Sequence, residues 1–157
     1  MIEKQIVKDI VEAFLQNTDY QLIDLTISAD NRIVVEIDSF EGVDIDFCAQ
    51  LTHHIESQLN RDKEDYELEV GSSGLTTPFK VLMQYQKNIG NPVEILTKEG
   101  KKLHGQLVDA DEDKFLVDIE EKVQIEGKKR KETQIITHTF KYDEVKYTLY
   151  DLKIEEK

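Results

Sequence analysis

Apolar residues in the first half of the chain recur with two periods, one of four residues and one of two. Apolar residues four apart over residues 2–14 predict an amphipathic helix. Alternation of apolar and polar residues over 23–27, and again over 33–37, predicts two strands with a turn at 29–31. The chain therefore begins with a helix followed by a β-hairpin.

A second helix and a third strand are predicted next. Apolar residues four apart over residues 47–59 predict the helix, and Asp44 or Asp46 caps it, because a carboxylate there meets free backbone N–H groups. Alternation over residues 66–70 predicts the strand. A three-stranded sheet covered on one face by two helices would bury these apolar faces. This α-β-β-α-β order is similar to a KH-like domain, which we expect to occupy residues 1–83.

A loop rich in glycine and serine follows the third predicted strand. Gly71 and Gly74 are three apart, which predicts positive φ or a close approach of the backbone. Pro78 lacks an N–H and suits a first helical turn, so we expect a short helix from Pro78 through Met83. A GxxG loop clamps RNA in KH domains. Here it follows a strand and has no basic neighbour, which favours a structural turn or a protein contact.

The second half of the chain shows only the period of two. Residues 84–91 form a predicted connector, and short strands then recur between glycine- and aspartate-containing turns. This pattern predicts a small β-barrel over residues 92–157, similar to SH3-like and Sm-like barrels. The segment 122–133 is longer than such a barrel needs, and we expect it to project as a hairpin insertion. The predicted fold class is α+β.

Residues 68–79 read Leu-Glu-Val-Gly-Ser-Ser-Gly-Leu-Thr-Thr-Pro-Phe. This stretch resembles the signature of the RimP family of ribosome maturation factors. Thr77 stands where that family carries an arginine, and a threonine cannot supply the planar positive charge that suits a phosphate. The other departures are Gly71, Ser73, Thr76 and Phe79. The residues that match in register are Leu68, Glu69, Val70, Ser72, Gly74, Leu75 and Pro78.

Two further segments extend this resemblance over the whole chain. Residues 42–51 hold a glycine, an acidic pair and a cysteine that opens the second predicted helix, as the family does. The predicted C-terminal strands, with Phe140, Tyr142 and Val145 before the last of them, resemble the family's SH3-like domain in order. The resemblance implies a cytoplasmic factor that binds the immature small (30S) ribosomal subunit and promotes its maturation. It also implies contact with rRNA and with a small-subunit ribosomal protein near the decoding region.

The net charge of the chain limits the partners that it can bind. The 157 residues carry a net charge of −13, which argues against general nucleic-acid binding, because that binding draws its affinity from neutralised phosphates. Residues 1–83 hold 17 Asp and Glu against 6 Lys and Arg, a net charge of −11. Residues 84–157 hold 16 and 14, a net charge of −2. The acidic half would attract a basic protein such as a ribosomal protein, or its acidity serves solubility alone.

One concentrated basic run follows Gly127, at the predicted tip of the hairpin insertion. Two interpretations of this run are open. It is a solvated tip, as such runs usually are, or it makes an electrostatic contact with rRNA. A second lysine pair at another predicted turn extends the same patch if the two tips lie together. The candidate contacts are Lys101, Lys102, Lys128, Lys129, Arg130 and Lys131.

Catalysis and metal binding find no support in the residue pattern. The single cysteine, Cys48, lies near the buried face of a predicted helix, where a thiol behaves as a small hydrophobe. His53 and His54 are adjacent and point about 100° apart on a helix, so they cannot both face one metal ion. Ser72 lies in no nucleophile elbow. We therefore expect no catalytic residue, no metal site, no cofactor and no small-molecule substrate.

The sequence thus predicts a two-domain binding protein rather than an enzyme. No apolar run approaches the roughly 20 residues of a membrane span, and the chain starts with an amphipathic pattern rather than a targeting segment. We expect a cytoplasmic monomer without membrane contact, acting in small-subunit maturation. The alternative is a stand-alone RNA-binding module with KH-like and Sm-like domains, and a hydrolase using Ser72 or Cys48 is the least favoured class.

Overall fold

The computed structural model of the chain describes residues 2–74, 77–124, 126–127 and 131–152. The chain divides into two compact units, Met1–Gly74 and Leu75–Lys157, which we name the first unit and the second unit. Each unit holds one β-sheet, and the described residues form a mixed α+β fold. Among the described helices, none has the length and apolar character needed to cross a membrane.

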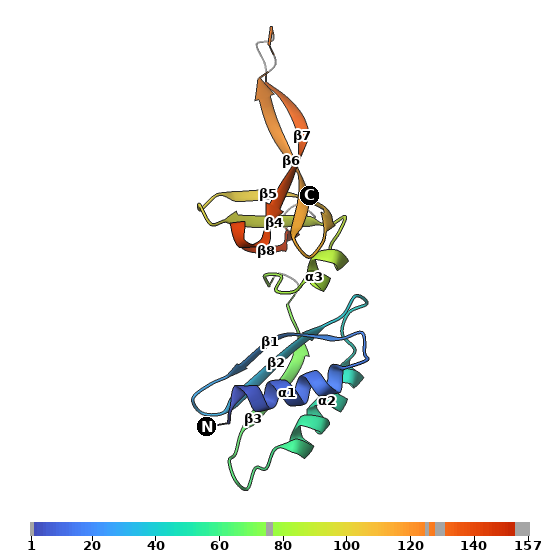
Figure 1. Ribbon diagram of the computed structural model, residues 1–157, viewed down its shortest axis with the longest axis vertical. Coiled ribbons are helices and arrows are strands. Elements are labelled where there is room, and N and C mark those ends of the chain that lie inside the picture. The colour runs from blue at the N-terminus through green and yellow to red at the C-terminus, as the bar shows by residue number, and fades with distance from the viewer. Residues whose placement is uncertain (1, 75–76, 125, 128–130, 153–157) are drawn as a thin grey trace. The chain divides into compact units, whose positions relative to one another are not determined.

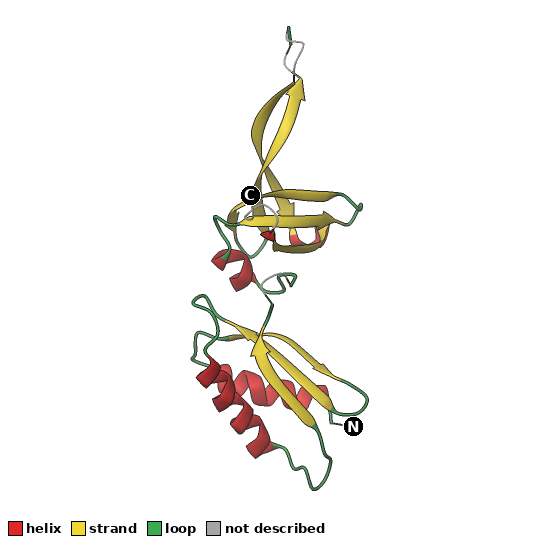
Figure 2. Ribbon diagram, turned by 180° about the vertical axis from the view of Figure 1, so that it is seen from behind, coloured by secondary structure: helices red, strands yellow, loops and turns green. Residues whose placement is uncertain are grey.

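The first unit has the element order that the sequence predicts. Figures 1 and 2 show both of its long helices on one face of its sheet. The Asp44 carboxylate caps the second helix by accepting the N–H of Asp46 at 2.9 Å, as predicted. The elements are α1 (Lys4–Leu15), β1 (Gln21–Ile27), β2 (Arg32–Asp38), α2 (Ile45–Gln58) and β3 (Glu67–Ser72).

The sheet of the first unit has the order β1-β2-β3. β1 pairs with β2 in antiparallel register, with Gln21 opposite Asp38, whereas β3 runs parallel to β2. A parallel pair needs a long crossover, which α2 supplies. The carboxyl ends of β2 and β3 therefore lie at one end of the sheet, and the turn between β1 and β2 lies at the other.

Alternation along β2 places its apolar side chains under the two helices. Ile33, Val35 and Ile37 are fully buried, whereas Arg32 and Val34 on the other face are not. The core of the first unit is completed by side chains from both helices, from β1 and from the residue just ahead of β3, chiefly Val7, Val11, Leu15, Leu25, Leu51, Ile55 and Tyr66. Burial of one face in this way drives the sheet and the helices together.

Asn31 ties together the end of the first unit where β1 turns into β2. Its φ of 59° is a left-handed conformation that asparagine tolerates better than most residues. Its side chain accepts the N–H of Ile2 at 3.0 Å and donates to Glu64 at 3.0 Å and to the Asp65 carbonyl at 3.1 Å. Its own carbonyl accepts the N–H of Glu67 at 3.0 Å. One residue thus fixes the N-terminal segment and the start of β3.

The second unit holds a five-stranded sheet in the order β7-β6-β5-β4-β8, with every neighbouring pair antiparallel. In this order β7 and β8 are edges, so pairing among the described residues does not close the sheet into a ring. Its elements are α3 (Leu82–Lys87), β4 (Pro92–Thr97), β5 (Lys102–Ala110), β6 (Lys114–Gln124), β7 (Lys131–Lys141), a 3₁₀ turn η1 (Tyr142–Glu144) and β8 (Val145–Tyr150).

The short helix begins at Leu82 rather than at Pro78, so that prediction is wrong. The N–H of Phe79 donates to the Thr148 carbonyl at 2.8 Å, which holds the chain extended alongside β8. The buried Gln84 side chain accepts the two backbone N–H groups just ahead of the helix, at 2.7 and 3.4 Å. Pairing with a distant strand therefore overrides the local helix signal of the proline.

Residues 75–83 lie in the second unit, although the sequence analysis assigns them to the first domain. Phe79 packs against the core of the second unit, and Tyr85 is only 6% exposed. The Tyr85 hydroxyl donates to Thr148 Oγ1 at 3.0 Å. The contacts therefore divide the chain after Gly74, and we place the proposed domain boundary there.

The β6–β7 hairpin leaves the rest of its sheet near Gly105. β5 pairs with β6 only over Gln106–Ala110, whereas β6 and β7 pair along their full length, and Figure 1 shows their hairpin extending beyond the other strands. A Cβ on Gly105 would overlap the Asp118 carbonyl oxygen and would lie 2.7 Å from Val117 Cγ1. Only glycine fits where β6 crosses β5 this closely.

The predicted hairpin insertion is a continuation of β6 and β7 rather than a separate element. Among the described residues, 122–124 pair with 131–133 in the register set by the rest of the ladder. Gly127 has a φ of 84°, as a turn at this place requires. Residues 125 and 128–130 lie outside the described part of the chain.

Gly71 does not need to be glycine, contrary to the expectation from the GxxG spacing. It lies in β3 opposite Glu36, its φ is not positive, and nothing lies within 4 Å of the position that a Cβ would take. Alanine therefore fits there without strain.

Alanine substitution should change the stability of the protein much more at Gly105 than at Gly71. Gly105→Ala should lower the free energy of unfolding by about 1–3 kcal/mol, because the added methyl overpacks a close crossing of strands. Gly71→Ala should change it by less than about 1 kcal/mol, because the Cβ has space. Urea unfolding followed by circular dichroism measures both, and equal losses would contradict the crossing as described.

Truncation tests the proposed boundary. A fragment of residues 75–157 should fold and should be more stable than a fragment of residues 86–157, which lacks Phe79 and Tyr85. Loss of a buried aromatic residue costs about 3–5 kcal/mol. Thermal unfolding of the two fragments gives the comparison, and a fragment 86–157 as stable as 75–157 would place the boundary later in the chain.

Candidate functional site

The predicted signature loop straddles the division between the two units. Glu69 lies in β3 and its side chain is 64% exposed, 3.4 Å from Arg32 Nη2. Ser72 is the exposed last residue of β3, and Gly74 and Pro78 are exposed too. Leu75 lies outside the described residues.

The first part of this loop is anchored to the first unit. The N–H of Ser73 donates to the Ile37 carbonyl at 3.3 Å, which continues the β2–β3 ladder by one bond. The loop therefore leaves the sheet at the same end as the segment between β2 and α2. In the described part of the chain, no lysine or arginine lies within residues 66–74, so no positive side chain from this stretch is available to a phosphate.

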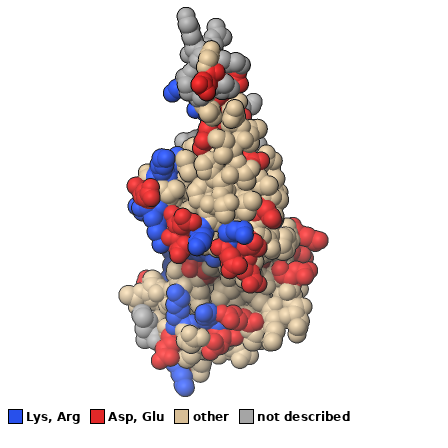
Figure 3. All heavy atoms as spheres, turned by 45° about the horizontal axis from the view of Figure 1, so that its top comes forward, with Lys and Arg blue, Asp and Glu red and all other residues tan. Residues whose placement is uncertain are grey.

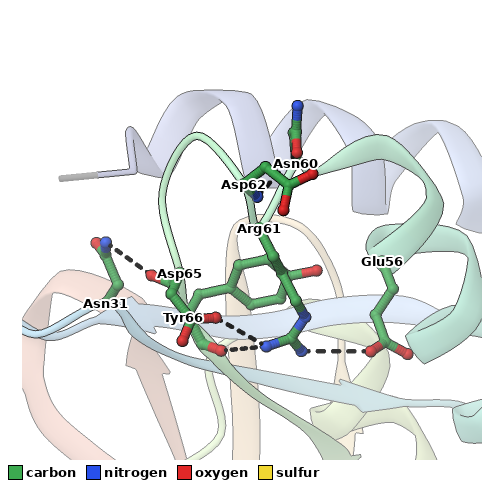
Figure 4. Close-up of polar contacts among 7 residues, drawn as sticks. All are labelled: Asn31, Glu56, Asn60, Arg61, Asp62, Asp65 and Tyr66. Carbon is green, nitrogen blue, oxygen red and sulfur yellow. Dashed lines mark hydrogen bonds and ion pairs between the residues drawn. The ribbon is translucent and has the colours of Figure 1, made fainter.

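Arg61 is engaged by its own unit. Its guanidinium donates to Asp65 at 3.1 Å, to the Tyr66 carbonyl at 2.8 Å and to Glu56 at 3.4 Å. Its central carbon lies 4.1 Å from the Tyr66 ring centroid, a cation–π contact. Figure 4 shows the side chain pointing back onto the connection between α2 and β3. Arg61 therefore stabilises that connection rather than presenting a free charge.

Lys101 and Lys102 lie at the β4–β5 turn, where both are exposed. The turn is closed by the N–H of Thr97 donating to the Lys101 carbonyl at 2.9 Å, and Gly100 has a φ of 95°. Residues 102–105 pair only with β4, whereas the outer half of β6 pairs only with β7. Figures 1 and 2 show the two hairpins diverging. The structure does not bring these lysines to the β6–β7 hairpin.

Lys131 is the one member of the basic run within the described residues. It is exposed and pairs with Gln124 across the ladder. Lys122 is exposed two residues further along the partner strand. Lys128, Lys129 and Arg130 lie outside the described residues.

Opposite charges accompany these lysines. Glu126 and Glu132 flank the basic run in the sequence. Figure 3 shows, on one face, Lys and Arg interspersed with Asp and Glu, including at the described residues next to the tip. On that face the described residues form no continuous basic surface, so a nucleic-acid contact there would be local.

A hollow of about 320 Å³ lies in the second unit, between α3 and η1. Burial, together with the nearby Tyr85 and acidic side chains such as Asp111, raises the pKa of Tyr142 to about 12. The Tyr142 hydroxyl therefore stays protonated and donates to the backbone carbonyls of Asp111 and Lys114. The lining mixes both charges and so selects no ligand by charge; it includes Phe79, Lys80, Glu112, Lys146 and Tyr147.

Two histidine–carboxylate pairs in the second unit are not predicted from the sequence. His104 Nδ1 lies 2.6 Å from a carboxylate oxygen of Asp151, which is 3% exposed, and His138 Nε2 lies 2.7 Å from Glu121. The members of each pair are 47 and 17 residues apart, and only strand pairing brings them together. No short sequence motif signals such pairs.

The other residues weighed for chemistry have structural surroundings. Cys48 packs beside the core of the first unit, and burial, with a contribution from Asp44, raises the pKa of its thiol. His54 packs on Phe14 at a centroid distance of 4.9 Å, while the His53 side chain is 83% exposed. Within the described residues, no three His, Cys, Asp or Glu side chains are grouped to hold a metal ion.

Comparison with known proteins finds similarity to one family along most of the chain. Residues 10–76 match the family model described as the RimP N-terminal domain. Two strains of Porphyromonas gingivalis have a protein named ribosome maturation factor RimP that is 42% identical over 139 residues, covering 87% of this chain and 91% of theirs. A protein of the same name from Christiangramia forsetii is 34% identical over 115 residues, covering 73% of this chain and 74% of its own.

The bonding of Arg61 leads to a stability prediction. Arg61→Lys should lower the unfolding temperature of the first unit, because an ammonium group cannot reach Glu56, Asp65 and the Tyr66 carbonyl with one planar fork. Arg32→Lys is the matched control and should leave it nearly unchanged, since Arg32 makes one exposed ion pair. Differential scanning calorimetry measures both variants, and equal effects would contradict a special role for Arg61.

Proposed function

The chain belongs to the RimP family of ribosome maturation factors, and we propose that it promotes maturation of the small (30S) ribosomal subunit by binding rather than by catalysis. The carrying observation is the 42% identity over 139 residues with relatives that bear that name. A match of this length exceeds either unit, so both units take part in the likeness. Cytoplasmic location and a monomeric state belong to the same proposal.

The finer fold assignments are part of this proposal. The α-β-β-α-β order, with both helices on one face of the sheet, supports a KH-like first domain. Five antiparallel strands around one core support an SH3-like second domain. Neither domain is assigned a cofactor or a small-molecule substrate.

Charge suggests a division of labour between the units. Residues 1–74 hold 17 Asp and Glu against 5 Lys and Arg, a net charge of −12, whereas residues 75–157 hold 16 against 15. The first unit would attract a basic small-subunit ribosomal protein, such as one near the decoding region, and would repel rRNA. The nearly neutral second unit would approach rRNA through local lysines, with Lys131 and its neighbours as the candidates.

A stand-alone RNA-binding module is the alternative function. The GxxG spacing at Gly71 favours it, but that residue lies in a strand and needs no glycine. Salt dependence discriminates between the two functions, because a general RNA binder loses affinity steeply with salt.

Co-sedimentation tests the proposed function. The pure protein should pellet with small subunits, and most with immature ones, but not with large subunits or assembled ribosomes. Cells lacking it should accumulate free small subunits with unprocessed rRNA. Equal binding to both subunits, together with a normal subunit profile at slow and fast growth, would overturn the proposal.

The basic run at residues 128–131 provides a second test of the proposed function. Changing residues 128–131 to serine should leave folding intact, since surface changes usually shift stability by less than about 0.5 kcal/mol each. If the run contacts rRNA, subunit affinity should fall, and the slope of log affinity against log salt should flatten by roughly 0.7–0.9 per lost contact.

The β4–β5 turn supplies the comparison for this test. Because the hairpins diverge, changing Lys101 and Lys102 to serine should act independently of the change at residues 128–131, and the two losses in log affinity should add. Unchanged affinity in both variants would mean that these tips are solvated. A weakened complex with an unchanged salt slope would exclude phosphate contacts as the cause.

A further inference from the structure

Two large apolar side chains are exposed where β2 connects to α2. Phe40 is 56% exposed, and Ile45, the first residue of α2, is 85% exposed. Single exposed apolar residues are ordinary, but two on one short segment form a place where a partner can bury apolar surface. Burying such a side chain fully is worth about 1.5–3 kcal/mol.

The segment that carries them is held in place. The N–H of Gly42 donates to the Ser39 carbonyl at 3.2 Å, and the Ser39 hydroxyl donates back to the Gly42 carbonyl. The N–H of Asp44 donates to the Tyr20 hydroxyl at 3.0 Å. The Tyr20 ring stacks on Phe47 with centroids 3.8 Å apart. A surface fixed in this way binds with a small loss of conformational entropy.

Among the described residues of the first unit, carboxylates surround this segment, and no Lys or Arg lies beside it. Glu41, Asp44 and Asp46 are exposed beside Phe40 and Ile45, and the exposed Asp19 precedes β1 at the same end of the sheet. The Lys and Arg of the first unit lie elsewhere: in the first half of α1, at the start of β2 and in the connection between α2 and β3. They are Lys4, Lys8, Arg32, Arg61 and Lys63.

A hollow adjoins the same place. It measures about 540 Å³ and lies between the end of α1 and the start of β1, lined by Glu12, Leu15, Gln16, Tyr20 and Leu22 among others. Tyr20 belongs both to this hollow and to the contact with Asp44. The C-terminal end of α1 carries the negative end of a helix dipole, which favours a cation. The hollow therefore offers space for a side chain, and the helix dipole beside it favours a positively charged one.

We propose that residues 12–22 and 38–46, here named the acidic end, dock an extended basic segment of a protein. An apolar side chain of that segment packs on Phe40 and Ile45, and its Lys or Arg side chains meet the carboxylates and the hollow. This rests on the proposed function and names the surface of its protein contact. RNA is disfavoured by the sign of the charge. A second copy of the chain is disfavoured because a symmetric contact would bring like charges together.

The test uses the full-length protein and individually purified small-subunit ribosomal proteins, with affinities from biolayer interferometry. The double variant Phe40→Ser/Ile45→Ser should bind its partner at least tenfold more weakly than the unchanged protein. Ile6→Ser is the matched control, since Ile6 is 49% exposed but lies in the first half of α1. It should bind within twofold of the unchanged protein, and thermal unfolding should show all variants folded.

Two double variants that each remove two carboxylates test the contribution of charge. Asp19→Asn/Glu41→Gln should weaken binding and flatten its salt dependence, because both carboxylates face the docked segment. Asp62→Asn/Glu67→Gln makes the same change in net charge at the opposite end and should have less than half that effect on log affinity. Equal effects would mean that net charge, and not this surface, attracts the partner.

Each remaining outcome decides between the two proposals. Undiminished partner binding by Phe40→Ser/Ile45→Ser overturns the docking surface. Binding to none of the individual proteins, with intact co-sedimentation with small subunits, overturns the docking surface and leaves the proposed function standing. Absence of both binding and co-sedimentation overturns the proposed function itself. Self-association of the unchanged protein that this variant abolishes would assign the surface to a second copy.

Discussion

The parallel pairing of β2 with β3 is the constraint on which the arrangement of the first unit depends. It forces the chain to cross over through α2, so both strands end at the same place and the connections that follow them lie together. The antiparallel start of β1 joins the same end, since Gln21 lies opposite Asp38. Both ends of the sheet carry carboxylates, but Arg61 is bonded to the connection at one end, whereas Glu41, Asp44 and Asp46 at the other end have no described Lys or Arg of the first unit beside them.

The close crossing of β5 and β6 has the same importance for the second unit. Gly105 lets the Asp118 carbonyl approach, and beyond this point β6 follows β7 instead of β5. Two hairpins therefore diverge from one core. Because each hairpin carries its own lysines, the second unit presents separate local positive charges among acidic neighbours, rather than a broad basic face of the kind that binds nucleic acid generally.

Local pattern was sufficient for much of the fold. The alternation of Ile33, Val35 and Ile37 identifies one face of β2 as buried, because successive side chains of a strand point to opposite faces. The pair Asp44 and Asp46 locates the start of α2 within two residues, because capping involves only neighbouring backbone groups, and the structure selects Asp44 as the cap. The signature over residues 68–79 indicated the family, and the acidic character of the first half follows from composition alone.

Residue pattern and composition were therefore sufficient to predict the order of the elements, the sign of the charge and the family. Features that depend on contacts between residues distant in the chain could not be predicted in this way. α3 begins at Leu82 because the N–H of Phe79 pairs with Thr148, nearly seventy positions away. Glycine is required at Gly105 and not at Gly71, because only Gly105 meets another strand's backbone. The separation of the first unit's Lys and Arg from Glu41, Asp44 and Asp46, and the separation of the lysine-bearing hairpins, likewise follow from strand order, which no local pattern specifies.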